Sequence, residues 1–567
     1  MSKDVNHFSL KSFIKEEFAS GLRQSLFVQY NKSLFLRDLR AGLVVSLIAI
    51  PLGMAIGIAC GLSPQNGLYA VVVIGLIAAI AGGSRFQVSG PTASFAAVLA
   101  PISAQFGAQG IFMVGLLAGI ILFGMALSRF GRFLTLIPYP VTTGYTLGSA
   151  VLIASIQIKD FFGLTYDEAP SNFLTRIYLL FDHWQSVQWQ ETAIGVFTFV
   201  VLLKWPAKFK NLPSPLISVM SAALFAWLFN HLMPSANIDT IASRYHYKLP
   251  DGGTAQGIPA LLPQFDFAFL FNWANFHSSL SVLLPAALAI AILASLEALF
   301  SATISDSLTN TKHKPNGELL GLALSNMIAP FFGALPGSGA LARTSTSIRY
   351  GAYSPLSAII HSFICLVILL LGANIISLIP MASLAALLMF IAVKLININH
   401  LKHLIEVAPK SDLFIIFICT FLIIAFDMVF GIVTGVVLAS LLFMKNLADS
   451  TESRISSSNL PNESDALSTY PPSKTVVFSI NGPLFFAVAE KALRALEVIG
   501  SDINQVDFDF SQTNTFDLTG IVAFETTVLK LRDKNIKLRL VNVNKNLKRS
   551  LAKSDVIAPY LHDDVKS

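Results

Sequence analysis

Charged residues are scarce in this 567-residue chain, at 13% of the sequence, whereas hydrophobic residues make up 54%. A soluble globular protein carries roughly 25% charged residues, so about half of the usual charge is missing. Apolar runs recur over the first four-fifths of the chain, and each is about long enough to cross a ~30 Å hydrocarbon core at ~20 residues per helix. Together with a mean hydropathy of +0.65, this composition predicts a polytopic membrane protein.

Cysteine is also scarce. Cys60, Cys365 and Cys419 are the three in the chain, far apart and each inside an apolar run. This spacing does not suit a disulfide framework or a metal site, so they are expected to be small core residues. The sequence further lacks a nucleophile–base arrangement, a cluster of metal ligands and a Walker loop. We therefore expect neither an enzyme nor an ATP-driven pump, and neither a cofactor nor a metal.

The N-terminal region lacks the short apolar block and cleavage motif of a signal peptide, so the first hydrophobic helix is expected to act as the insertion signal. The formal net charge is +6. Most of the basic residues fall in short loops between apolar runs, where they set the topology. A nucleic-acid partner is therefore not expected, and the surroundings of the chain are predicted to be membrane lipid.

Apolar runs and Gly/Pro punctuation predict fourteen membrane segments. They are 41–60, 67–82, 90–102, 110–128, 138–158, 191–204, 214–232, 280–304, 317–334, 339–350, 355–373, 376–393, 411–427 and 430–446. With the N-terminus in the cytoplasm, the short outside loops carry no Lys or Arg, as the positive-inside rule requires. We expect a multi-pass protein of the cytoplasmic (inner) membrane of a bacterium.

The domain organisation follows from changes in periodicity. Residues 1–40 are expected to form a cytoplasmic N-terminal arm, 41–446 the transmembrane domain, and 447–473, rich in Ser, Asn and Pro, a polar linker. Residues 474–567 alternate strands and helices, which predicts a small cytoplasmic α/β layer domain. Its expected strands are Thr475–Ile480, Val506–Phe510 and Ile536–Val541, and its expected helices Val488–Ile499 and Thr519–Leu531.

The third and tenth segments open alike, with Ser89-Gly90-Pro91-Thr92 and Leu335-Pro336-Gly337-Ser338-Gly339. Both are too short to span a membrane, and both stand third in a run of seven, which is the best sequence pointer to a transporter site. In an inverted repeat their N-termini would meet near the midplane, each with unpaired N–H groups and about half a positive charge. Such a pair predicts an anion site. The alternative is that Gly and Pro are simply common in membrane helices.

The candidate substrate-binding residues at these openings are Pro91, Thr92, Ala93, Ser94, Gly339, Ala340, Ala342 and Arg343. Arg343 would add a positive charge to the helix dipole. The alternative interpretations are that Arg343 snorkels to the cytoplasmic face or that it pairs with a fixed carboxylate. Glu297, in the eighth segment, is interpreted as a proton carrier or as a counter-ion of Arg343, and we favour the proton carrier. Asp306 and Asp427 lie nearer helix ends, where a solvated or capping role is favoured.

Several motifs resemble the sulfate permease (SulP) family over nearly the whole chain. They are Asp38-Leu39-Arg40-Ala41-Gly42, Ile50-Pro51-Leu52-Gly53-Met54-Ala55, Gly67-Leu68-Tyr69, Gly83-Ser84-Arg85, Ser89-Gly90-Pro91-Thr92-Ala93, Asn316, Glu318-Leu319, Asn326-Met327-Ile328-Ala329-Pro330-Phe331-Phe332-Gly333, Arg343-Thr344-Ser345 and Ser354-Pro355-Leu356. The C-terminal region resembles STAS domains through Asn481-Gly482-Pro483-Leu484 and Asp509-Phe510-Ser511 with Asp517-Leu518-Thr519-Gly520.

This resemblance implies an α-helical membrane protein with a seven-plus-seven inverted repeat, usually dimeric, that moves small anions by an elevator-like step. It implies a substrate held between the third and tenth helices with help from the first and eighth. A carboxylate at the position of Glu297 is associated with proton-coupled members. In STAS relatives a phosphorylated serine follows the loop Asp, where this chain has Leu518, so a structural or partner-docking role is expected instead, which leaves room for a cytosolic partner.

The first segment departs from the family pattern. Many sulfate-type members resemble Pro-Gln-Gly-Met-Ala-Tyr/Phe there, but this chain has aliphatic Leu52 and Ile56. We therefore add these two residues to the expected substrate lining. An aliphatic lining favours a longer organic anion, and residues 82–86 and 311–314 resemble the dicarboxylate-uptake branch, named DauA. Proton-coupled symport of C4-dicarboxylates such as succinate, fumarate or aspartate is the leading hypothesis. Sulfate or bicarbonate transport, an uncoupled anion channel and a membrane-anchored regulator are the alternatives.

Overall fold

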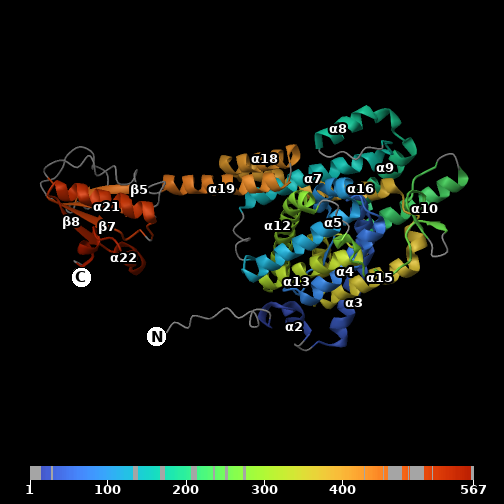
Figure 1. Cartoon of the computed structure of the whole chain (residues 1–567), viewed down its shortest axis with the longest axis horizontal. Coiled ribbons are helices and arrows are strands. Elements are labelled where there is room, and N and C mark those ends of the chain that lie inside the picture. The colour runs from blue at the N-terminus through green and yellow to red at the C-terminus, as the bar shows by residue number, and fades with distance from the viewer. Residues whose placement is uncertain are drawn as a thin grey trace. The chain divides into compact units, whose positions relative to one another are not determined.

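The computed structural model describes residues 15–26, 30–131, 138–166, 173–205, 213–233, 237–248, 253–271, 276–426, 428–450, 452–457, 475–482, 484, 503–513 and 515–562. The chain divides into two compact units, Met1–Val436 and Val437–Ser567 (Figure 1). Each unit is treated by itself below.

The first unit is a helical bundle that carries two short antiparallel strand pairs. Its main helices are α3 (Lys32–Ala59), α4 (Pro64–Ala81), α5 (Ala96–Leu127), α7 (Tyr139–Phe162), α9 (Trp189–Lys204), α10 (Ser214–Leu232), α12 (Phe276–Thr309), α13 (Pro315–Ile328), α14 (Leu341–Arg349), α15 (Leu356–Ile376), α16 (Met381–Ile396) and α18 (Lys410–Ala425), and α19 (Met428–Ser450) begins there. Shorter elements are α2 (Ser20–Leu26), η1 (Ala93–Phe95), α8 (Phe173–Asp182), η2 (Trp184–Ser186), α11 (Ile241–Arg244), η5 (Ala268–Leu270), η6 (Ala329–Phe332), α17 (Ile398–Val407) and strands β1 (Ser89–Gly90), β2 (His246–Lys248), β3 (Thr254–Gln256) and β4 (Ser338–Gly339).

Every predicted membrane segment overlaps one of these helices. Eight helices in the described parts of the chain are long and apolar enough to cross a membrane. The third and fourth predicted segments run together in α5, where the backbone leaves the helical conformation at Gly107 (φ 64°, ψ −161°). Glycine suits this break because it adopts a positive φ without a steric penalty. The polytopic helical fold is confirmed, and the number of fourteen spans stays a prediction.

The first predicted segment belongs to a longer helix. Helix α3 begins at Lys32, nine residues before the predicted start, so part of the arm belongs to it. The charged residues at the end of the arm ended the apolar run but do not end the helix. Asp38 is buried there and accepts hydrogen bonds from the backbone N–H groups of Tyr353 and Ser354, at 2.6 and 3.1 Å. A buried carboxylate is tolerated when hydrogen bonds replace its hydration.

The second unit contains a four-stranded sheet in the order β5-β6-β7-β8. Strands β6 (Thr475–Asn481), β7 (Gln505–Asp509) and β8 (Lys537–Val541) are parallel neighbours. Helix α21 (Leu518–Asp533) connects β7 to β8, and α22 (Lys545–Leu551) and η8 (Ala558–His562) follow β8. Phe478, Phe508 and Phe524 are fully buried in its core. These elements confirm the predicted alternation of strands and helices, while the predicted helix Val488–Ile499 lies outside the described residues.

The predicted linker contains structure that the sequence did not indicate. Strand β5 (Glu452–Ser457) pairs antiparallel with β6, and α19 ends at Ser450, so the range 447–473 is not all linker. The polar sequence of β5 gave no apolar alternation. An edge strand is nevertheless held by backbone hydrogen bonds along one side, so it needs no apolar face of its own. Residues 458–474 lie outside the described residues.

Candidate functional site

The two broken segments meet through their backbones. Strands β1 and β4 pair antiparallel, with Ser89 opposite Gly339 and Gly90 opposite Ser338. The pairing continues into the helix that follows, because Ala340 N–H donates to the Val88 carbonyl at 3.0 Å. Antiparallel strands send the two following helices in opposite directions. The predicted opposition of the two half-helices is therefore present in the structure.

Gly337 and Asn326 allow β1 and β4 to approach each other closely. A Cβ atom at Gly337 would lie 2.4 Å from the carbonyl oxygen of Gly90, so no larger side chain fits there. The buried amide of Asn326 accepts from Gly337 N–H at 2.9 Å and donates to the Gly337 carbonyl at 3.0 Å. A single side chain thereby satisfies both backbone groups at the entry to β4, as buried polar groups require.

Neither half-helix has a side-chain cap at its N-terminus. Thr92 is the N-cap of η1 and Ala340 the N-cap of α14, and neither residue's side chain accepts a hydrogen bond from the helix. The first N–H groups of a helix have no intrahelical acceptor and carry the positive end of its dipole. An anion that reaches these termini therefore meets two sets of N–H donors.

Glu297 of α12 joins the two half-helices. Its carboxylate accepts hydrogen bonds from the hydroxyls of Ser94 in η1 and Ser338 in β4. The Tyr145 hydroxyl of α7 donates to the same carboxylate at 2.7 Å. The Glu297 side chain is half-buried, so it keeps some contact with solvent. One titratable group thus contacts the third, fifth and tenth predicted segments, which suits the proton-carrier interpretation.

Arg343 crosses from α14 to the other half-helix. It is 2% exposed, and its Nη2 donates to the Pro91 carbonyl at 2.6 Å. No carboxylate of the described chain lies within 4.0 Å of its guanidinium, and its Nε is buried without a partner there. The geometry fits neither snorkelling nor a direct ion pair with Glu297. The guanidinium instead places a buried positive charge beside the broken end of the third segment.

The Gly90→Ala variant tests whether the position of Arg343 sets substrate affinity. A Cβ atom at Gly90 would lie 2.6 Å from Nη1 of Arg343, so the guanidinium has to move away from Pro91. We expect substrate affinity to fall about tenfold, or about 1.4 kcal/mol. The matched control is Gly124→Ala, whose Cβ meets nothing within 4 Å. Equal substrate dissociation constants for the two variants would remove Arg343 from the site.

The other predicted site residues differ in exposure. Ala342 is exposed, Leu52, Thr92 and Ala340 are half-buried, and Pro91, Ala93, Ser94 and Gly339 are buried. Ile56 is 1% exposed, so in this structure its side chain packs in the core and does not line an open space. Leu52 remains accessible. Of the two aliphatic residues expected at the lining, Leu52 is therefore the accessible one.

Tyr145 and Gln87 were missed by sequence analysis. Gln87 donates from Nε2 to the Ala298 carbonyl at 3.2 Å and accepts from the Ser301 hydroxyl at 2.9 Å, which attaches the entry of β1 to α12. A tyrosine inside an apolar run and a glutamine in a short loop carry no motif of their own. Their proximity to the site arises from contacts between distant parts of the chain.

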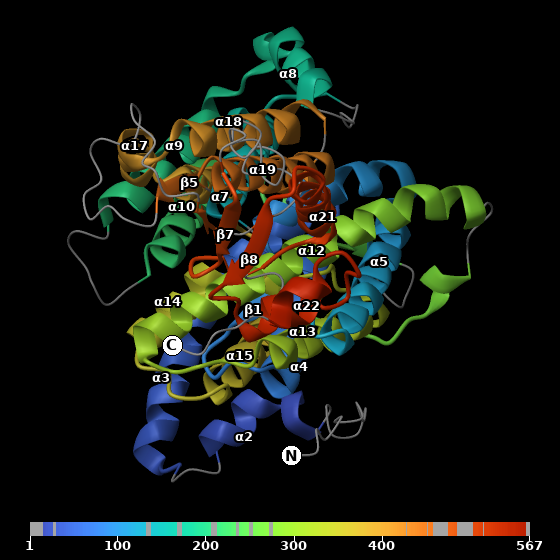
Figure 2. The same cartoon turned by 90° about the vertical axis from the view of Figure 1, so that its left-hand side faces the viewer.

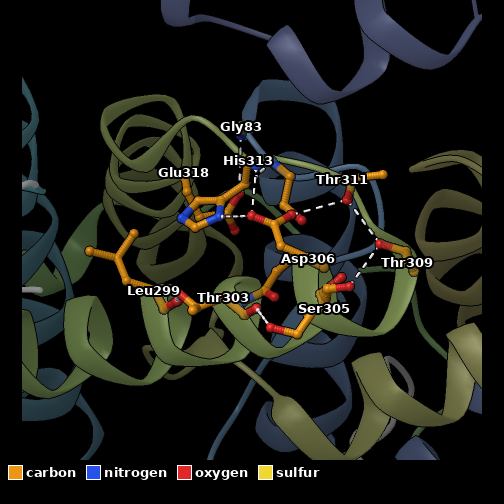
Figure 3. A network of polar contacts seen from close by, with 12 residues as sticks. Gly83, Leu299, Thr303, Ser305, Asp306, Thr309, Thr311, His313 and Glu318 are labelled. Carbon is orange, nitrogen blue, oxygen red and sulfur yellow. Dashed lines mark hydrogen bonds and ion pairs between the residues drawn. The ribbon is translucent and has the colours of Figure 1, made fainter.

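A second polar cluster links the end of α12 to the loop that follows it. Figure 3 shows Asp306 between Thr311 and His313. Its carboxylate accepts from the Thr311 hydroxyl at 3.0 Å, from His313 N–H at 2.9 Å, and is 2.7 Å from His313 Nδ1. Asp306 therefore joins the end of α12 to the loop that follows it, while Asp427 lies outside the described residues.

The same cluster includes the two stretches that resemble the dicarboxylate branch. Glu318 accepts from the N–H groups of Gly83 and Ser84 at 3.0 and 2.9 Å, and Lys314 N–H donates to the Gly83 carbonyl at 3.2 Å. Residues 82–86 and 311–314 therefore pack against each other. Neither stretch contacts Glu297 or Arg343 in these hydrogen bonds.

An Asp306→Ala variant should lower the stability of the protein without changing its substrate affinity. It removes the acceptor of three hydrogen bonds, so we expect the free energy of unfolding to fall by about 1–3 kcal/mol. Substrate affinity should stay within about twofold of wild type, because Asp306 makes no contact with Glu297 or Arg343. Thermal unfolding of the purified protein and tracer binding measure the two quantities. Lost affinity at unchanged thermal stability would contradict this assignment.

Comparison with known proteins gives the family. Residues 35–419 match the Sulfate permease family and residues 467–559 match the STAS domain. YvdB of Bacillus subtilis is 31% identical over 529 residues, which cover 93% of this chain and 95% of YvdB. The bicarbonate transporter BicA of Picosynechococcus sp. is 26% identical over 91% of this chain and 90% of BicA.

Among solved structures, the murine anion transporter Slc26a9 shares the fold with a TM-score of 0.83 and 16% identity, over 98% of this chain and 92% of that one. These similar proteins are transporters and not enzymes. The uncapped, opposed half-helices fit that class, since they offer binding groups and no reactive nucleophile. The chain therefore belongs to the sulfate permease family, as a multi-pass membrane anion transporter with a C-terminal STAS domain.

Proposed function

We propose that the protein is a proton-coupled symporter of small anions and that Glu297 carries the proton. The single observation that carries this proposal is the position of Glu297, which accepts hydrogen bonds from Ser94, Tyr145 and Ser338 between the two half-helices. No other carboxylate of the described chain contacts both half-helices.

The coupling follows from charge. When Glu297 is ionised, its negative charge opposes the positive contributions of Arg343 and the two helix ends, and it repels an anion. When Glu297 is protonated, the site is net positive and one of its oxygens becomes a donor, so the hydroxyls that donate to that oxygen must rearrange. Anion binding and proton binding then favour each other reciprocally, which is the thermodynamic requirement for symport.

The proposed substrates are C4-dicarboxylates such as succinate, fumarate or aspartate. Two opposed helix N-termini offer one donor set for each carboxylate, and half-buried Leu52 offers an aliphatic contact for the carbons between them. The alternative is sulfate or bicarbonate, and the family description and the name of BicA favour it. Labelled succinate uptake into proteoliposomes, with unlabelled sulfate, bicarbonate and aspartate as competitors, decides between them. Competition by sulfate alone would overturn the dicarboxylate assignment.

The remaining assignments concern assembly and orientation. We propose a homodimer in the cytoplasmic membrane with the N-terminus and the STAS domain in the cytoplasm. Asp517 caps α21 by accepting from Gly520 N–H at 2.7 Å, and Leu518 beside it is 77% exposed, which supports a docking role better than a phosphoserine switch. Removing the residues after Ala448 tests whether transport needs the STAS domain. Full flux without them would show that the domain is not needed.

A further inference from the structure

Helices α3 and α14 pack against each other (Figure 2). A groove lined by three arginines lies between these two helices. Its volume is about 710 Å³, and its lining includes Ser33, Leu36, Arg37, Arg40, Arg349 and Tyr350. Arg37 and Arg40 come from the first turns of α3, and Arg349 ends α14. None of these residues belongs to the Glu297 cluster, and no acidic side chain of the described residues lines the groove.

The positive charge of this groove is not compensated within the described chain. Arg37 donates from Nε to the Gly351 carbonyl at 3.0 Å, and no carboxylate of the described residues lies within 4.0 Å of the three guanidiniums. Asp38 is their neighbour in sequence, but it is buried and its Oδ2 accepts from Ser354 Oγ at 2.5 Å and Tyr30 OH at 2.8 Å. The arginines therefore have unused donors for an anion.

Apolar side chains continue from the groove along α3. Leu36, Leu39 and Leu43 are 53%, 38% and 47% exposed. Their spacing places them on one face of the helix. In a membrane protein such a face is covered by acyl chains. Arginines beside it extend their guanidiniums to the level of the lipid headgroups. A ligand that satisfies both features carries an anionic group and a hydrocarbon tail.

We propose that the groove binds an anionic phospholipid, with the phosphate of its headgroup on Arg37, Arg40 and Arg349 and an acyl chain along Leu36, Leu39 and Leu43. Basic pockets between membrane helices bind anionic headgroups in this way. Free phosphate shares the headgroup chemistry but leaves the exposed leucines uncovered, so the lipid fits the groove better. This site is separate from the proposed transport site and does not depend on which anion is carried.

Thermal unfolding of the full-length protein in a neutral detergent tests the proposal, with phosphatidylglycerol, phosphatidylcholine or inorganic phosphate titrated in. Phosphatidylglycerol should raise the unfolding midpoint of wild type in a saturable manner, because a ligand that binds only the folded state stabilises it. The R37Q/R40Q/R349Q variant should raise the apparent dissociation constant for phosphatidylglycerol at least about tenfold. The control K394Q/K402Q/K410Q removes three exposed lysines elsewhere and should bind like wild type.

The single variant R40Q serves if the triple variant does not fold, since Arg40 makes no hydrogen bond or ion pair with the described chain. It should weaken phosphatidylglycerol binding about threefold or more and leave the midpoint without lipid unchanged. Equal phosphatidylglycerol affinity in wild type and the arginine variants would overturn the proposal. So would an equal shift by phosphatidylcholine, or by inorganic phosphate at the same concentration.

Discussion

Replacing Glu297 by glutamine should abolish the pH dependence of substrate binding. In wild type we expect substrate affinity to fall as pH rises, because the ionised carboxylate between Ser94 and Ser338 opposes the bound anion. Glutamine has the shape of a protonated glutamate but cannot ionise. The Glu297→Gln variant should therefore bind substrate with a dissociation constant that no longer changes with pH, and gradient-driven accumulation should fall by about tenfold or more.

The matched control is Glu406→Gln, which removes an exposed carboxylate on α17. It should keep the wild-type pH profile. Tracer binding to the purified protein and uptake into proteoliposomes measure the two effects separately. A Glu297→Gln protein with the wild-type pH profile would show that the proton is carried elsewhere, and Glu297 would then be a structural acceptor for Ser94, Tyr145 and Ser338.

Replacing Arg343 by alanine should weaken substrate binding by about 30-fold or more. The change removes a buried positive charge, and a charged hydrogen bond is worth about 1.5–3 kcal/mol. It also leaves the Pro91 carbonyl without its donor. Arg343→Lys keeps the charge but loses the planar fork, so an intermediate affinity is expected. Substrate dissociation constants, measured by tracer binding, give the comparison.

The control for Arg343 is Lys402→Ala, which removes an exposed positive charge from α17. Its affinity should equal that of wild type. Substrate protection against thermal unfolding provides a second readout, because the Arg343 variant should need about 30-fold more substrate for the same rise in unfolding temperature. Wild-type affinity in Arg343→Ala would show that the helix N-termini bind the anion without the guanidinium.

The half-helices could be predicted because Pro91 and Gly337 mark breaks at matching places in the two halves. Their register could not be predicted, because strands of two residues carry no periodicity. The partner of Arg343 is the backbone carbonyl of Pro91, and a backbone acceptor leaves no trace in sequence. Tyr145 was missed for a related reason: it meets Glu297 across 152 residues of chain.

The predicted element boundaries differ from the structure where local composition and tertiary contacts disagree. Arg37 and Arg40 ended the apolar run, but they are exposed helical residues of α3, and Asp38 between them finds its partners at Tyr353 and Ser354. Strand β5 was missed because pairing with β6 holds it without an apolar face. Ile56 was expected at the lining because it replaces an aromatic residue of the family pattern, yet its side chain is buried.

Proton movement during anion uptake tests the central claim most directly. Proteoliposomes that hold wild-type protein and an internal pH indicator should acidify inside when succinate is added outside, with no acidification in Glu297→Gln. Acidification should saturate with the same half-maximal succinate concentration as uptake, because one proton-linked site serves both. Succinate uptake without internal acidification would contradict the account.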